Sequence, residues 1–114
     1  MLFFSTIAIA DNCNKPKDDF DNLYCLNKVY QAADKDLNKA YKKLKKLLKR
    51  NGRKKLKQRQ RGWIRKRNHK CSFRRNGVFY VSLSCTTKTT IARTNELRNR
   101  IRECKATGCQ PSKL

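Results

Sequence analysis

The fold is decided by residues 23–50, which read LYCLNKVYQAADKDLNKAYKKLKKLLKR. Apolar residues recur in alternating steps of three and four, at Leu23, Leu26, Tyr30, Ala33, Leu37, Ala40, Leu44 and Leu47. This spacing predicts one long helix with a single apolar stripe. Asp21 and Asn22 are candidate N-caps, and Asn51-Gly52 is expected to end the helix. A helix of about 27 residues is roughly 40 Å long, so its stripe must pack against other elements.

Two further helical patterns follow this first one. The second extends from about Arg53 to Lys70, and its short connection to the first predicts an antiparallel helical hairpin. The third begins near Thr86 to Thr90, where a threonine cap is available. It carries Ile91, Thr94, Leu97, Ile101 and Cys104 at helical spacing. We therefore predict an all-α fold, a small three-helix domain made of a long helical hairpin plus a C-terminal helix and tied by disulfides.

The core of this domain is expected to contain one large aromatic residue. Trp63 is the largest source of buried area available to the helical hairpin. The predicted core residues are Leu37, Tyr41, Leu44, Trp63 and Leu97. Between Cys71 and Cys85, Asn76-Gly77 indicates a turn and residues 78–81 a short extended piece, so we expect an ordered loop. The tail, residues 106–114, is expected to fray.

Six cysteines in 114 residues indicate a disulfide framework. Fifteen pairings are open in principle, and the sequence alone does not choose among them. Pairing of neighbours is the simplest solution, and it joins Cys13 to Cys25, Cys71 to Cys85, and Cys104 to Cys109. The intervals between these cysteines do not match zinc-ligand spacing, and there is only one histidine, so no metal site is expected.

The N-terminal residues 1–10 carry no charge and end in Ala8-x-Ala10, which is typical of the end of a secretory signal. We interpret residues 1–10 as a signal-peptide remnant and residues 11–114 as a single domain. The alternative is that residues 1–10 form a hydrophobic first strand or tail of the mature fold. No stretch approaches the 18 or more apolar residues of a membrane span. The expected location is secreted or periplasmic, because oxidised cysteines fit that compartment.

Charge is distributed very unevenly along the chain. The protein has 30 Lys and Arg against eight Asp and Glu, a formal net charge of +22. The 59 residues from Leu37 to Asn95 contain no acid and 21 of the basic residues. Twelve of the basic residues on the first two helices form a predicted polyanion-binding surface, called the basic surface below: Lys42, Lys43, Lys45, Lys46, Lys49, Arg50, Arg53, Lys54, Lys57, Arg61, Arg65 and Lys66.

The basic surface favours a non-enzymatic binding protein for an anionic polymer outside the cytoplasm. Lipopolysaccharide, wall polymer and nucleic acid, bound without sequence specificity, are the partners that this charge fits. The alternative is a solvated surface that only keeps a secreted protein soluble. A second alternative is a small basic secreted toxin or effector, because the amphipathic first helix fits an anionic membrane.

Catalysis has little support in the sequence. His69 is the only histidine and has no acid near it in the sequence. Asp34 and Asp36 are two residues apart on a helix, so they do not face each other as a hydrolase pair would. No phosphate-binding glycine loop is present. We therefore expect no enzymatic activity and no cofactor. We also expect the protein to be a monomer.

Several motifs together resemble a known family. They are Asn12-Cys13, Cys25, Ala33-Asp34-x-x-Leu37-Asn38-x-x-Tyr41-x-x-Leu44, Gln60-x-x-Trp63-Ile64-x-x-Arg67-x-x-x-Cys71, Cys85 and Thr90-x-x-Arg93-Thr94-x-Glu96-Leu97. In order and spacing this set resembles the LprI-like lysozyme-inhibitor family of exported bacterial proteins. The resemblance implies a mainly helical, disulfide-bonded, extracytoplasmic domain without cofactor or catalysis. It makes inhibition of lysozyme the alternative to polymer binding, with lysozyme as the partner.

The resemblance also suggests a structural role for four polar residues. Asp34, Asn38 and Arg67 are expected to form a buried polar set that joins the first two helices. Arg93 is expected to fix the register of these helices. A structural role is favoured because buried charges need partners.

Export can be tested directly. Mass spectrometry of the native protein should find Asp11 as the first residue. Cleavage after Ala10 places the small residues Ala8 and Ala10 at positions −3 and −1, which signal peptidase recognises. Retention of Met1 in a reduced cytosolic protein would contradict the signal-peptide interpretation.

Overall fold

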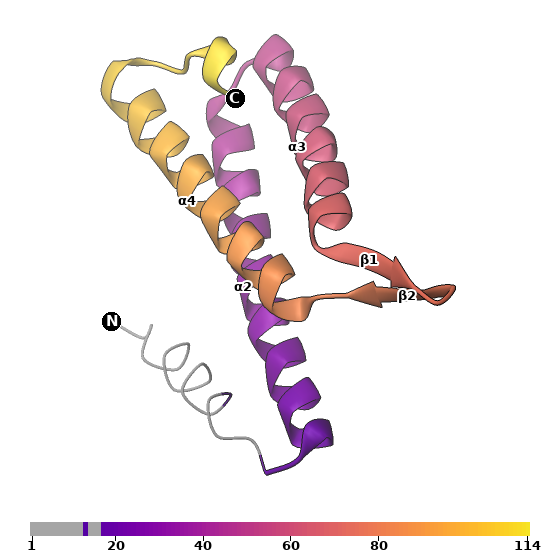
Figure 1. Ribbon diagram of the computed structural model, residues 1–114. Coiled ribbons are helices and arrows are strands. Elements are labelled where there is room, and N and C mark those ends of the chain that lie inside the picture. Colours follow the sequence, from indigo (N-terminus) through magenta and orange to yellow (C-terminus); the bar gives the residue numbers. More distant parts are fainter. Residues whose placement is uncertain (1–12, 14–16) are drawn as a thin grey trace.

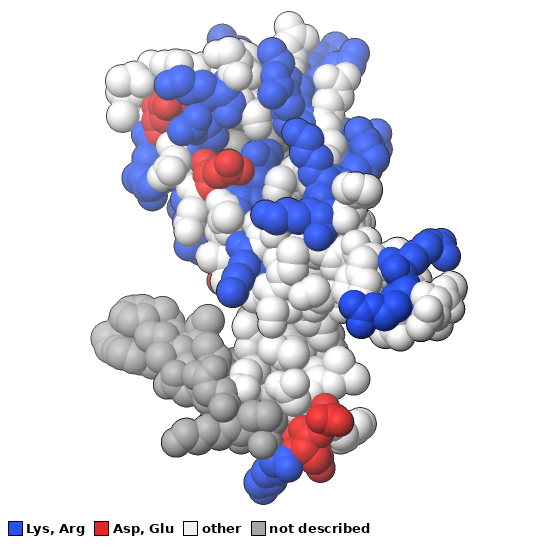
Figure 2. Space-filling model, in the orientation of Figure 1, with Lys and Arg blue, Asp and Glu red and all other residues white. Residues whose placement is uncertain are grey.

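The computed structural model describes Cys13 and residues 17–114, so the predicted signal segment at residues 1–10 lies outside the described residues. The elements are α2 (Asp19–Leu47), α3 (Arg50–Lys70), β1 (Ser72–Arg75), β2 (Val78–Val81), α4 (Leu83–Thr107) and the short 3-10 helix η1 (Pro111–Lys113). The prediction of a mainly α three-helix domain is confirmed. α2 and α4 run in the same general direction, α3 runs the opposite way, and β1 and β2 project from one side (Figure 1 and Figure 2).

The start of α2 is set by its acidic first turn. The Asp18 side chain caps the helix by accepting a hydrogen bond of 2.7 Å from the Asp21 main-chain N–H. Asp19 and Asp21 lie in the first turn, where negative charge interacts favourably with the helix dipole. The cap is therefore Asp18, three residues before the predicted Asp21.

The end of α2 differs from the prediction because of Leu48. Leu48 is extended and buried, so the chain turns there and α3 begins at Arg50. Asn51-Gly52 consequently lies inside α3, where it does not end a helix. A Cβ on Gly52 would lie 3.2 Å from Leu48 Cδ2, so the glycine serves the close approach of Leu48 to α3.

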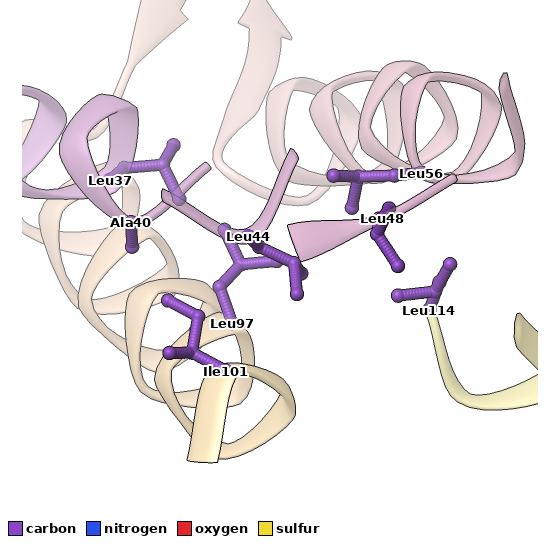
Figure 3. Packing of buried hydrophobic residues seen from close by; sticks show 8 residues of the cluster. All are labelled: Leu37, Ala40, Leu44, Leu48, Leu56, Leu97, Ile101 and Leu114. Atoms are coloured by element: carbon purple, nitrogen blue, oxygen red, sulfur yellow. The ribbon is translucent and has the colours of Figure 1, made fainter. Parts of the chain in front are cut away.

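The core lies mainly between α2 and α4, which share the most extensive helix contact, while α3 packs less extensively on both. Leu44, Leu56 and Leu97 are each 0% exposed, one from each helix. The buried cluster consists of Leu37, Ala40, Leu44, Leu48, Leu56, Leu97, Ile101 and Leu114 (Figure 3). Tyr41 and Trp63 are only partly buried against this cluster. Trp63 is thus at the edge of the core, because the main helix contact does not involve α3.

Helix α4 begins earlier than predicted. Thr94, Leu97 and Ile101 of its predicted face are buried, but Ile91 is not. Ser82 is the N-cap, and its side chain accepts a hydrogen bond from the Cys85 main-chain N–H. The threonines that were expected to cap the helix are inside it, and Thr90 is 0% exposed. Ile91, predicted to lie on the apolar face, is 47% exposed because the buried positions run through Thr90, Thr94 and Leu97.

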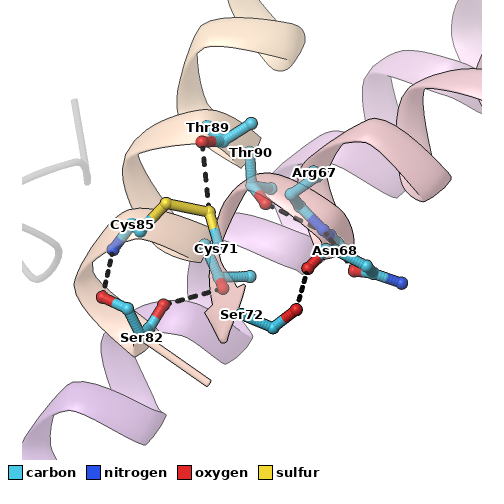
Figure 4. The surroundings of a disulfide bond; sticks show 9 residues. Arg67, Asn68, Cys71, Ser72, Ser82, Cys85, Thr89 and Thr90 are labelled. Atoms are coloured by element: carbon cyan, nitrogen blue, oxygen red, sulfur yellow. Dashed lines mark hydrogen bonds between the residues drawn. A yellow bond between two sulfur atoms is a disulfide. The ribbon is translucent and has the colours of Figure 1, made fainter. Parts of the chain in front are cut away.

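The segment between Cys71 and Cys85 is a β-hairpin, more regular than the expected loop. Strands β1 and β2 are antiparallel, and Arg75 pairs with Val78 across the turn. Asn76 and Gly77 both have positive φ, 52° and 78°, as a tight two-residue hairpin turn requires. At the base, the Cys71–Cys85 disulfide and a 2.8 Å hydrogen bond from the Ser82 N–H to the Cys71 carbonyl close the hairpin (Figure 4).

The structure joins each cysteine to its neighbour, as favoured in the sequence analysis, in the pairs Cys13–Cys25, Cys71–Cys85 and Cys104–Cys109. The last of these pairs explains why the predicted fraying of residues 106–114 is wrong. The chain folds back after Gly108 through η1, and Leu114 is buried in the core. Arg93 Nη2 donates a 3.3 Å hydrogen bond to the Leu114 main-chain oxygen. Within the described residues, no helix is long and apolar enough to cross a membrane.

The packing of α2 against α4 predicts that two leucines of α2 differ in their contribution to stability. Leu44→Ala should reduce the free energy of unfolding by about 2 to 5 kcal/mol, because it leaves a cavity in a fully enclosed site. Leu23→Ala is the matched control, and it should cost about 1 kcal/mol or less because Leu23 is 57% exposed. Urea denaturation measures both values. Equal losses would contradict a core centred on Leu44.

Candidate functional site

All twelve residues of the basic surface are exposed. The ion pairs among the described residues are Arg93–Glu96, Arg100–Glu103 and Lys113–Glu103, so none of the twelve is paired with a described acid. On the face shown in Figure 2, Lys and Arg gather over the part of the molecule that holds α3 and the C-terminal ends of α2 and α4. The positive charge is therefore open to solvent and not neutralised within the described chain.

The basic surface follows stripes on two helices. On α3, Gly52, Leu56 and Gln60 face the protein, and the basic residues spaced by three and four lie opposite them. These residues are Arg50, Lys54, Lys57, Arg61 and Arg65. The α2 and α3 stripes meet at the turn between the helices, where Arg53 Nε donates a 3.3 Å hydrogen bond to the Lys45 main-chain oxygen.

Helix stability does not explain the charge at the start of α3. The Lys49 N-cap makes no side-chain capping hydrogen bond, and the first turn contains no acid. Positive side chains at a helix N-terminus interact unfavourably with the helix dipole. Arg50, Arg53 and Lys54 all lie in the first five residues of α3. A nearby anion would relieve this repulsion.

A second basic feature, not predicted from the sequence, is a groove of about 460 Å³ between α2 and α4. We call it the basic groove, and its lining residues are Asp36, Lys39, Ala40, Lys43, Arg98, Ile101, Arg102 and Lys105. Buried Ala40 and Ile101 lie between basic side chains contributed by both helices. Only Lys43 had been predicted as a binding residue. The helical spacing of Arg98, Arg102 and Lys105 was visible, but their position opposite α2 depends on tertiary packing.

Arg67 connects all three helices at the other end of α3. Its guanidinium lies 5.0 Å from the ring centre of Trp63 and 5.9 Å from that of Tyr30, which belongs to α2. Arg67 Nη1 donates a 3.3 Å hydrogen bond to Thr90 Oγ1 on α4. Its Nε and Nη2 donate to Asn68 Oδ1 at 3.2 and 3.1 Å (Figure 4). The side chain is thereby held by contacts with two aromatic rings and by hydrogen bonds.

Arg93 has the second structural role, between α3 and α4. Its Nε donates a 2.9 Å hydrogen bond to Gln60 Oε1, and the Arg93 side chain is almost completely buried. The partners Gln60 and Thr90 were not predicted for these arginines. The structure does not place Asp34 and Asn38 with them: Asn38 is exposed, and among the described residues neither side chain makes a hydrogen bond or ion pair. The side-chain hydrogen bonds of Arg67 and Arg93 therefore join α3 to α4. The sequence had predicted that such contacts would join α2 to α3.

A cleft of about 310 Å³ lies where the base of the hairpin meets the helices. Tyr30, Phe79, Val81 and Leu83 give it apolar walls, while Arg67 contributes a positive charge. The remaining lining residues are Asn68, Cys71, Ser72 and Thr86. An apolar cleft with a few polar groups is typical of a binding site.

The hairpin, residues 72–81, presents large side chains on both faces. Phe73 and Tyr80 stack with ring centres 5.2 Å apart on one face. Phe79 lies on the other face, which borders the cleft, and the Arg74 guanidinium lies 5.7 Å from its ring centre. The five large apolar residues from Phe73 to Val81 are between 44% and 58% exposed. The hairpin is therefore an aromatic and cationic element that the helices do not cover.

In the part of the chain that the structure describes, the residues considered for catalysis make no hydrogen bond or ion pair with one another. His69 and Asp36 are exposed and Asp34 is only partly buried. Among the described residues, no group of three His, Cys, Asp or Glu side chains is arranged to hold a metal ion. The arrangement of the described residues provides binding surfaces, with charge, aromatic rings and one small cleft.

Comparison with known proteins identifies the family. The sequence profile of the family described as lysozyme inhibitor LprI matches residues 11–97. No curated protein and no solved structure shows a significant similarity to the chain. The matched segment contains α2, α3 and the hairpin, and it ends inside α4 before Arg98, Arg102 and Lys105 of the basic groove. Because the match covers most of the chain, the protein belongs to the LprI lysozyme-inhibitor family.

Proposed function

We propose that this protein is an exported, non-enzymatic inhibitor of lysozyme. The family match over residues 11–97 carries this proposal, because it includes every element that frames the cleft and the hairpin. Three disulfides support a location outside the cytoplasm, since such bonds persist in oxidising compartments. The exposed rings of the hairpin support binding to another macromolecule.

The net charge of the protein determines how it interacts with lysozyme at long range. Common animal lysozymes are strongly basic, so a protein of charge +22 is repelled by them at long range. Salt screens this repulsion over about 8 to 10 Å at 0.10 to 0.15 M. Contacts inside a shielded interface are screened much less. Direct inhibition therefore requires close local complementarity, and it should tolerate salt.

Direct inhibition can be separated from coating of the cell wall. With a basic lysozyme and a soluble N-acetylglucosamine oligosaccharide, inhibition should persist or strengthen between about 50 and 200 mM salt, because only the long-range repulsion is screened. Hydrolysis rates with and without the protein are compared at each salt concentration.

The same titration on whole cells, followed by turbidity, is the comparison. Inhibition that occurs only on cells and disappears with salt would contradict direct inhibition. That result would mean that the protein masks the wall polymer.

Binding of an anionic polymer is the second candidate function. The specific observation that favours it is the basic surface, which has no described acid paired with it, together with the basic groove. Wall polymers, lipopolysaccharide and nucleic acid carry repeated negative charges that match a groove lined from two helices. The membrane-directed toxin has less support, because Leu37, Ala40 and Leu44 of α2 are buried in the core and would have to be released.

The groove makes a specific prediction for polymer binding. The triple variant Lys39→Ala, Arg98→Ala, Arg102→Ala should elute from immobilised heparin at clearly lower salt than the parent, because it removes charges that converge on one groove. The control is Lys57→Ala, Arg61→Ala, Arg65→Ala, which removes the same charge from the α3 stripe and should shift elution less. Neutralisation of about six to ten charges predicts a roughly thousandfold or greater loss of affinity between about 50 and 200 mM salt. Equal shifts for both triple variants would contradict a role for the groove.

A further inference from the structure

We infer that the hairpin, residues 72–81, is the element that enters the substrate cleft of lysozyme. This inference rests on the proposed inhibition of lysozyme and specifies where that inhibition occurs. The observations that carry it are the exposure of the hairpin, its rigid base and the chemistry of its side chains.

The apolar side chains of the hairpin are not explained by the stability of the fold. A two-stranded hairpin is marginally stable by itself, and the described hairpin side chains contribute nothing to the buried cluster of the helices. Phe73 and Phe79 nevertheless lie on opposite faces, each about half exposed. Contiguous exposed apolar groups mark interaction sites, and buried aromatic anchors supply much of the energy in protein interfaces.

The conformation of the hairpin is preorganised in the free protein. Its base is closed by Cys71–Cys85 and by the hydrogen bond from Ser82 to Cys71, and its tip is a tight Asn76-Gly77 turn. The stacked rings of Phe73 and Tyr80 further restrict one face. Such preorganisation raises affinity because less conformational freedom is lost on binding.

The charges near the tip fit a glycosidase active site. Arg74 and Arg75 each lie over an aromatic ring, that of Phe79 at 5.7 Å and that of Phe73 at 5.6 Å from the ring centre. Glycosidases, lysozyme included, cleave their bond between two carboxyl groups. Guanidinium groups bind carboxylates through paired, charge-assisted hydrogen bonds. The hairpin contains no acid of its own to repel these carboxylates.

The shape of the hairpin also suits this partner. The two strands lie about 5 Å apart, against about 8 to 10 Å between the axes of packed helices, so the hairpin offers a cleft-shaped partner a slimmer element than a helix pair would. The aromatic face of Phe73 and Tyr80 would then lie against the walls that normally hold sugar rings. Local attraction at the tip therefore opposes the long-range repulsion between two basic proteins.

The test is a pair of double variants that remove equal charge. Arg74→Ala with Arg75→Ala should weaken inhibition of a basic lysozyme, on the soluble oligosaccharide, by at least tenfold. Lys35→Ala with Arg59→Ala, two exposed residues outside the hairpin, the basic surface and the basic groove, should leave the inhibition constant within about twofold. If charge acted only at long range, both variants would reduce repulsion and inhibit slightly better. Thermal melting and mass spectrometry of the disulfides check that both variants are folded.

A competition experiment addresses the location directly. A saturating, slowly hydrolysed trisaccharide of N-acetylglucosamine should reduce binding of the parent protein to lysozyme, because both occupy the cleft. Undisturbed binding, or equal inhibition by the two double variants, would overturn the hairpin inference and leave lysozyme inhibition standing. A parent protein that does not inhibit on the soluble substrate would overturn both. Sedimentation that gives a dimer for the parent at assay concentration and a monomer for Phe73→Ala would also overturn the inference, because the hairpin would then be covered by a second copy of the chain.

Discussion

The structure depends on burial of the apolar stripe of α2 against α4. One third of the residues are charged, so few side chains are available to form a core. Leu44 and Leu97 meet in this seam and are completely removed from solvent. With this face of α2 fixed, its lysines must lie outside, and those beside the seam form one wall of the basic groove. The packing of α2 against α4 therefore determines both the core and the position of the charged surface.

The remaining contacts organise the other end of the molecule. Arg67 contacts the rings of Tyr30 and Trp63 and donates a hydrogen bond to Thr90, so it connects α3 to both α2 and α4 near the base of the hairpin. The cleft and the hairpin lie within the segment matched by the family profile, whereas every α4 residue that lines the basic groove lies beyond it. This division agrees with our proposals that lysozyme binds at the hairpin and anionic polymers at the groove.

Periodicity predicted what depends on local sequence, namely three helices, a single apolar stripe on α2 and a turn at Asn76-Gly77. It could not predict features that depend on which helix packs against which. Thr90 is buried and Ile91 exposed because α4 is oriented by contacts from other helices. Gly52 resembled a helix end, yet it serves close packing of Leu48. The partners of Arg93 come from α3 and from the tail, so no local pattern indicated them.

The disulfide at the base of the hairpin has one further consequence. Cys71 ends α3 and Cys85 lies in the first turn of α4, so their bond fixes the distance between the two points from which the hairpin leaves the helices. A newly made, reduced chain lacks this restraint, and its strands are free to separate. If the protein is exported as we propose, oxidation outside the cytoplasm would stiffen the hairpin only after the chain has left the reducing compartment.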